Sequence, residues 1–236
     1  MQICGLQKLS LLDFPGKLAA TVFTGGCNLR CPFCHNASLV THAAGTERIP
    51  VSEVLDFLKN RIGKLDGVCV SGGEPLIQDG IEDFIRELRA LGFLVKLDTN
   101  GCFPEKLAAL LDAALLDYVA MDVKNSPAKY AATVGVPDFD VTSVLKSAAL
   151  LKDSGVPYEF RTTLVRGLHE PADMVGIGEI IKGAPTYYLQ NFKDSGDLVG
   201  FAAGAQTAVL SGFSTPELDA FRAAAAPYVG EVIRRN

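Results

Sequence analysis

Expected strands and helices alternate along the chain, in six strand–helix units with short connections. Short runs of β-branched and other apolar residues predict strands at 18–24, 67–70, 93–97, 118–123, 157–165 and 186–192. Apolar residues spaced three and four apart predict helices at 50–62, 79–91, 104–114, 141–154, 171–182 and 216–233. Such an alternation is typical of a parallel sheet that is covered by helices and joined by right-handed crossovers.

Six strand–helix units are fewer than the eight that close a complete barrel. The sequence therefore predicts an α/β fold, an open partial (β/α)6 barrel with parallel strands and a lateral gap that admits a loop of a large partner. No linker, charge block or low-complexity tract interrupts the chain. We expect a single domain over residues 1–236, with a core at about 12–192 and a C-terminal helical extension at about 214–233.

Three of the six cysteines lie within eight residues, directly after the first expected strand. Cys27, Cys31 and Cys34 have the spacing C-x3-C-x2-C, which lets thiolates converge on one metal centre. Structural zinc sites and ordinary electron-transfer clusters usually have four protein ligands, so three cysteines favour an iron–sulfur cluster with one open iron. The alternative is a zinc or redox site that takes a fourth ligand from Cys4, Cys69, Cys102 or His35.

Composition indicates the cellular compartment and the classes of partner of this chain. The net charge of −5, without clustered Lys and Arg, argues against a nucleic-acid surface. The first ten residues lack the pattern of a signal peptide, and the apolar runs fall short of the ~20 residues of a membrane span. We therefore expect a cytoplasmic protein with no nucleic-acid or membrane partner, whose reduced thiols serve as metal or redox ligands.

Polar residues also follow the next three expected strands. Gly72-Gly73-Glu74 comes after the second strand, Asp98 and Asn100 after the third, and Asp122 and Lys124 close the fourth. The carboxyl ends of parallel strands meet at one edge of a sheet, where α/β proteins place their chemistry. We therefore expect these groups to lie beside the cysteine loop.

This set of groups suits a zwitterionic ligand beside a metal. Gly72 and Gly73 let the backbone approach a ligand closely, and their carbonyls can accept hydrogen bonds from an ammonium group next to Glu74. Lys124 suits a carboxylate as a mobile point charge. An amino acid with free amine and carboxylate groups would chelate the open iron directly.

Other residues suit the remainder of such a ligand. Asp98 and Asp122 suit a cation or ribose hydroxyls, and Phe33 lies where an aromatic base can rest. Arg161 lies inside the fifth expected strand and needs an anion or acid if it is buried. We expect Arg161 to contact the ligand.

The cysteine motif, with Phe33 before its last cysteine, is followed by Gly-Gly-Glu-Pro at 72–75. In this combination the chain resembles the radical S-adenosylmethionine (SAM) superfamily. Motifs at 13–17, 34–36, 98–101 and 121–124 are similar to those of the glycyl-radical-enzyme activases. Segments 158–163 and 188–192 are similar to the activating proteins of anaerobic ribonucleoside-triphosphate reductase, and the resemblance runs from about Leu12 to Phe192.

The resemblance implies a radical SAM type of barrel with a [4Fe-4S] cluster on Cys27, Cys31 and Cys34. SAM would bind the fourth iron through its amine and carboxylate. One-electron reduction, from a flavodoxin- or ferredoxin-type donor, would cleave the sulfonium to methionine and a 5′-deoxyadenosyl radical. That radical would remove a hydrogen atom from a glycine of the partner, a glycyl-radical enzyme, here anaerobic ribonucleotide reductase.

The resemblance also assigns contacts to SAM. The amine is expected at the 72–74 turn, and the carboxylate and ribose near the charged residues at the ends of the third and fourth strands. Phe33 and His35 would flank the adenine, and no residue beyond the cluster ligands is expected to be catalytic. The full set of expected contacts is Phe33, His35, Gly72, Gly73, Glu74, Asp98, Asn100, Asp122, Lys124 and Arg161.

Three alternatives to this function stay open. The partner can be pyruvate formate-lyase or another glycyl-radical enzyme, or the substrate can be small, as in the carboxy-deazaguanine synthases. The third alternative is a non-enzymatic zinc or iron–sulfur binding module. Among the remaining residues, we expect Cys69 in the core and His42 and His169 at the surface. Segment 195–212 suits a partner-recognition loop or a flexible tail, and we favour the tail.

Overall fold

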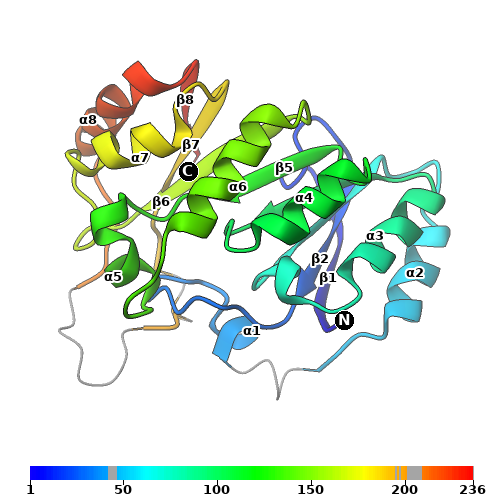
Figure 1. The fold of residues 1–236 in the computed structure, drawn as a ribbon. Coiled ribbons are helices and arrows are strands. Elements are labelled where there is room, and N and C mark those ends of the chain that lie inside the picture. Colours follow the sequence, from blue (N-terminus) through cyan, green and yellow to red (C-terminus); the bar gives the residue numbers. More distant parts are fainter. Residues whose placement is uncertain (42–46, 195, 197, 201–208, 236) are drawn as a thin grey trace.

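The computed structural model describes residues 1–41, 47–194, 196, 198–200 and 209–235 (Figure 1). These residues form an open eight-stranded sheet in which each strand pairs with its neighbours in sequence. Strand β1 is antiparallel to β2, and every later pair is parallel. The strands are β1 (Ile3–Ser10), β2 (Ala19–Thr24), β3 (Gly67–Gly72), β4 (Leu94–Thr99), β5 (Tyr118–Asp122), β6 (Tyr158–Leu164), β7 (Thr186–Asn191) and β8 (Glu231–Arg235).

Helices connect the parallel strands, and Figure 1 shows α4 and α6 in front of the sheet. The α-helices are α1 (Ala37–Thr41), α2 (Val51–Lys59), α3 (Ile81–Ala90), α4 (Pro104–Asp112), α5 (Tyr130–Val134), α6 (Thr142–Asp153), α7 (Asp173–Ile181) and α8 (Thr215–Ala225). Three short 3-10 turns are η1 (Pro75–Ile77), η2 (Pro127–Lys129) and η3 (Ala226–Tyr228). None of the helices in the described ranges is long and apolar enough to cross a membrane.

Strand alternation separates an apolar face from a polar one. On β6, Phe160 and Leu164 are fully buried in the apolar core that the helices cover. The intervening residues Arg161 and Thr163 point to the opposite face and line a cavity. The helical side of the sheet thus supplies the core, and the other side is left for charged groups.

The open α/β sheet of parallel strands is confirmed, and all six expected strands are present. Two strands at the sheet edges were not expected. The prediction of a helix at 216–233 is wrong in its second half, because α8 ends at Ala225 and residues 231–235 form β8 beside β7. Pro227 and Gly230 interrupt the helical pattern, and the buried Val232 anchors the new strand.

Candidate active site at the carboxyl ends of the strands

A cavity of about 260 Å³ opens at the carboxyl ends of the parallel strands. The cysteine loop forms one side of this cavity, and the ends of β3 to β7 form the rest. It brings together residues separated by more than 130 positions in sequence, as the strand-end argument predicted. The sequence-predicted site residues in its lining are Cys27, Cys31, Phe33, Cys34, His35, Gly72, Gly73, Asp98, Asn100, Asp122, Lys124 and Arg161.

The cysteine loop presents its three thiols to this cavity from a hydrogen-bonded turn. The N–H of Cys34 donates to the carbonyl of Cys31 at 3.0 Å, and the N–H of Leu29 donates to Sγ of Cys27 at 3.4 Å. Burial raises the pKa of Cys27 and raises that of Cys31 to about 12, although Lys124 lowers the latter. Thiolates at these positions therefore need a cationic centre between them, which a metal cluster supplies.

The arrangement of the thiols fits a polynuclear cluster. Across the described parts of the chain, no three His, Cys, Asp or Glu side chains are grouped so that they could share one metal ion. In a four-iron cluster each thiolate binds a different iron, so the three thiols need only face one cavity. Cys27, Cys31 and Cys34 all line the cavity, and three thiolates would leave one iron of such a cluster open to a further ligand.

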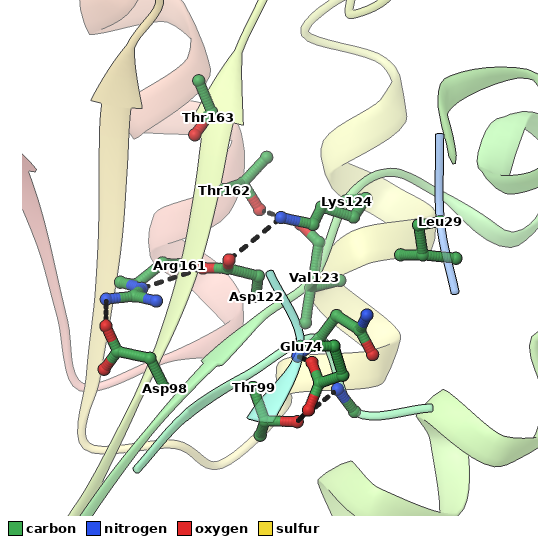
Figure 2. A network of polar contacts seen from close by, with 12 residues as sticks. Leu29, Glu74, Asp98, Thr99, Asp122, Val123, Lys124, Arg161, Thr162 and Thr163 are labelled. Carbon is green, nitrogen blue, oxygen red and sulfur yellow. Dashed lines mark hydrogen bonds and ion pairs between the residues drawn. The ribbon is translucent and has the colours of Figure 1, made fainter. Parts of the chain in front are cut away.

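A chain of ion pairs crosses the cavity floor from β4 to the end of β5 (Figure 2). Asp122 accepts from Nζ of Lys124 at 2.9 Å and from Nε of Arg161 at 2.8 Å. Arg161 also contacts Asp98 at 3.3 Å, and Asp98 pairs with the buried Lys96. In the cavity lining Lys124 and Arg161 balance Asp98 and Asp122, and the buried Lys96 adds a third cation behind the lining. The lining thus offers two cations to an anionic group of a ligand.

These ion pairs keep the carboxyl groups of Asp122 and Asp98 ionised. Burial disfavours the ionised form of Asp122, but Arg161 and then Lys124 outweigh it and hold the pKa of Asp122 well below its ordinary value. Burial likewise disfavours ionised Asp98, and Arg161 and Lys96 outweigh it, so the pKa of Asp98 is also lowered. Both carboxylates are therefore charged at neutral pH. The expectation that Arg161 needs an acid partner is confirmed.

The packing of the backbone requires glycine at positions 72 and 73. Gly72 has φ +121°, and a Cβ there would lie 2.2 Å from the backbone nitrogen of Thr24. A Cβ on Gly73 would lie 1.9 Å from the carbonyl oxygen of Gly26. Side-chain-free backbone thus lets the end of β3 pack against the end of β2, and it leaves both glycines exposed to the cavity.

Glu74 lies behind the cavity wall. Its side chain is fully buried and is not among the described residues that line the cavity. Its Oε1 accepts from the Thr99 hydroxyl at 2.8 Å and the Leu76 N–H at 3.1 Å, and its Oε2 accepts from the Asn100 N–H at 2.7 Å (Figure 2). Burial raises the pKa of Glu74 to about 7, against the hydrogen bonds from Asn100 and Thr99. Glu74 therefore ties the glycine turn to the end of β4.

Aromatic rings form the side of the cavity next to the cysteine loop. Phe33 is buried, and the edge of its ring contacts the imidazole of His169, with ring centroids 6.5 Å apart. His35 stacks on Phe192 at 5.3 Å with an interplanar angle of 24°. The cysteine loop thus contacts His169 through Phe33 and Phe192 through His35, and both contacts stabilise its position.

His169 was expected at the surface, and this prediction is wrong. Its side chain is buried, its Nε2 donates to the carbonyl of Lys124 at 2.7 Å, and its Nδ1 accepts from the N–H of Val165 at 3.2 Å. Burial lowers its pKa, so the imidazole stays neutral. Its polar partners are backbone groups of loops, which no sequence pattern indicates. The other histidine expected at the surface, His42, lies outside the described residues.

Sequence reasoning missed several polar residues in the cavity wall. Thr163 lies two positions after Arg161 on β6 and pairs with Gln190 of β7. Its hydroxyl donates to Oε1 of Gln190 at 3.4 Å. The period-two alternation of a strand was the available signal, because it places Thr163 on the same face as Arg161. The remaining lining residues that were not predicted are Leu29, Asn36, Val40, Ser71 and Thr99. Cys69 is buried in β3, as expected.

Comparisons with known proteins show the family of the chain. Residues 21–175 match the model of the radical SAM superfamily. A Methanocaldococcus jannaschii protein, named as a glycyl-radical enzyme activating enzyme, is 35% identical over 81% of this chain and 80% of its own. The pyruvate formate-lyase-activating enzyme of Staphylococcus epidermidis is 31% identical over 75% of this chain and 73% of its own.

Solved structures share the fold. A domain of a pyruvate-formate lyase-activating enzyme from Bacteroides vulgatus matches 72% of this chain and 99% of its own, with a TM-score of 0.56 and 16% identity. Streptococcus suis SuiB bound to S-adenosylmethionine matches 90% of this chain with a TM-score of 0.66 and 12% identity. The matched region is about half the length of SuiB. The chain belongs to the radical SAM superfamily, among the glycyl-radical enzyme activating enzymes.

Proposed function

We propose that this chain reductively cleaves SAM at a [4Fe-4S] cluster and generates a glycyl radical on anaerobic ribonucleoside-triphosphate reductase. The observation that carries the proposal is a cavity that is lined by the three cysteines and by the ion-paired cations Lys124 and Arg161. When bound, the cluster and SAM supply a one-electron reduction and a carbon radical able to take a hydrogen atom from glycine. The protein supplies binding, orientation and exclusion of water.

Each part of the cavity has a role in this proposal. Cys27, Cys31 and Cys34 hold three irons, and the cations Lys124 and Arg161 attract the SAM carboxylate. The backbone at Gly72 and Gly73 faces the SAM amine, and the ribose lies near Asp98 and Asp122. The wall that contains Phe33 and His35 accepts the adenine. Asn100 lines the cavity beside Cys27.

The partner's glycine segment enters beside β7. A second cavity of about 350 Å³ shares His35, Thr163 and Gln190 with the first, and it also includes Arg235 of β8. The two cavities thus adjoin, which supports a route from the outer strands to the cofactor site. The carboxamide of Gln190 stands at their junction and suits the N–H and C=O groups of a peptide backbone.

A second candidate partner is pyruvate formate-lyase. The relatives from Staphylococcus and Listeria carry the name pyruvate formate-lyase-activating enzyme, and they are 29–31% identical to this chain. Anaerobic ribonucleotide reductase is preferred because segments 158–163 and 188–192 resemble its activating proteins. In the structure these segments form β6 and β7, where the two cavities meet.

Electron paramagnetic resonance separates these partners. The reconstituted protein is mixed anaerobically with SAM, a chemical reductant and either candidate enzyme. The reductant replaces the flavodoxin- or ferredoxin-type protein that would supply the electron in the cell. We expect the doublet of a glycyl radical with the reductase and no doublet with pyruvate formate-lyase. The Cys31→Ala variant serves as the control without radical. A doublet only with pyruvate formate-lyase would reassign the partner. No doublet with either, despite SAM cleavage, would favour a small substrate.

A further inference from the structure

The side chain of Asn100 bridges the end of β4 and the first cysteine of the loop. It is 5% exposed, and its Nδ2 lies 3.8 Å from Sγ of Cys27 and 2.9 Å from Oδ1 of Asn28. Its Oδ1 accepts the N–H of Cys102 at 3.0 Å. Because that N–H can only donate, the oxygen of the carboxamide must face Cys102. The two hydrogens of Nδ2 therefore point to Asn28 and Cys27.

The backbone of Asn100 is held as firmly as its side chain. Its N–H donates to Oε2 of the buried Glu74 at 2.7 Å. The other oxygen of Glu74 accepts from the Thr99 hydroxyl at 2.8 Å and from the Leu76 N–H at 3.1 Å. Glu74 therefore holds β4 and the turn after β3 in one position, and this fixes the distance from the carboxamide of Asn100 to the sulfur of Cys27.

We infer that Asn100 donates an N–H···S hydrogen bond to the Cys27 thiolate and so raises the reduction potential of the cluster that Cys27 holds. The inference rests on the proposed function, because it needs a cluster on the three thiols. The backbone N–H of Leu29 adds a second bond to the same sulfur at 3.4 Å. Hydrogen bonds to the sulfurs are one of the factors that set iron–sulfur potentials.

The sign of the effect follows from charge. One-electron reduction adds negative charge to the cluster and to its thiolate ligands, so an N–H donor stabilises the reduced state more than the oxidised state. Asn100 therefore makes reduction easier, and its removal moves the midpoint potential to a more negative value. Since the cluster must accept an electron before SAM is cleaved, Asn100 is a positioning residue for that step.

Redox titration of the reconstituted full-length chain, followed by electron paramagnetic resonance, tests this inference. In Asn100→Leu the amide is replaced by an apolar group of similar size. We expect a more negative potential, equivalent to an equilibrium constant for reduction about threefold to tenfold smaller. Asn191→Leu is the matched control, since the carboxamide of Asn191 bonds the backbone of Phe213, and its potential should equal that of the unmodified protein.

A second variant separates the loss of the hydrogen bond from an effect on folding. Asn100→Ser keeps the backbone bond to Glu74 and a polar atom near Cys102, but its side chain is too short to reach Cys27. We expect it to bind the same amount of iron as the unmodified protein and to show a shift in the same direction. Loaded Asn100 variants with an unchanged potential would overturn the inference. Failure of the unmodified protein to assemble a cluster would instead overturn the proposed function.

Discussion

Replacement of Cys27, Cys31 or Cys34 by alanine is expected to abolish SAM cleavage. Each thiol faces the same cavity, and a cluster with three protein ligands has no spare ligand to replace a lost one. We expect each variant to bind little iron and to form no 5′-deoxyadenosine above background. Chromatographic assay of 5′-deoxyadenosine and methionine after anaerobic reduction measures this loss.

Cys4→Ala is the matched control for this experiment. Cys4 is a half-buried thiol on β1, and it is not among the residues that line the cavity. This variant should keep the iron content and the cleavage activity of the unmodified protein. Full cleavage by any one of the three loop variants would show that the assigned ligand set is wrong.

Substitution of Arg161 is expected to have the second largest effect. Arg161→Met removes the cation that contacts both Asp98 and Asp122, while it keeps a side chain of similar length. Loss of one partner of a buried ion pair leaves an uncompensated charge and costs about 3–5 kcal/mol of unfolding free energy. The net charge of the cavity floor also falls by one, so we expect weaker SAM binding. Chemical denaturation and SAM titration measure the two losses.

The pH dependence of this loss identifies its cause. Arg161 lowers the pKa of Asp122 and Asp98, so the stability it contributes is present above their ordinary pKa and is lost as the pH falls through the lowered values. The difference between the two proteins should therefore be present at pH 7 and shrink below about pH 4. Arg166→Met is the control, because its pair with Glu217 is exposed to solvent and should contribute little to stability. Equal losses at Arg161 and Arg166 would contradict a buried network.

Much of the fold could be predicted because its signals are local. The period-two and period-3.6 patterns indicated the parallel strands and their helices, and the strand ends indicated where the site would form. The edge strands lacked such signals. β1 mixes polar and apolar residues and is partly exposed, and β8 follows a helix so closely that its apolar residues continued the helical pattern.

The parts of the site that could be predicted are those whose residue type indicates a binding role. The thiols at C-x3-C-x2-C and the charged groups at the strand ends could be selected by residue type and position, and the structure brings them to one cavity. His169 was placed at the surface because its partners are backbone groups of Lys124 and Val165, which no sequence pattern indicates. Only the tertiary structure shows that this side chain is buried, and the same holds for the burial of Glu74 against Thr99 and Asn100.

The most direct test of the central claim is the paramagnetic resonance spectrum of the reduced protein before and after SAM is added. The protein is first reconstituted anaerobically with iron and sulfide. We expect about four irons per chain and a spectrum that changes when SAM binds, because SAM occupies the iron that Cys27, Cys31 and Cys34 leave open. One tightly bound zinc ion per chain, with no change in the spectrum on addition of SAM, would contradict this account.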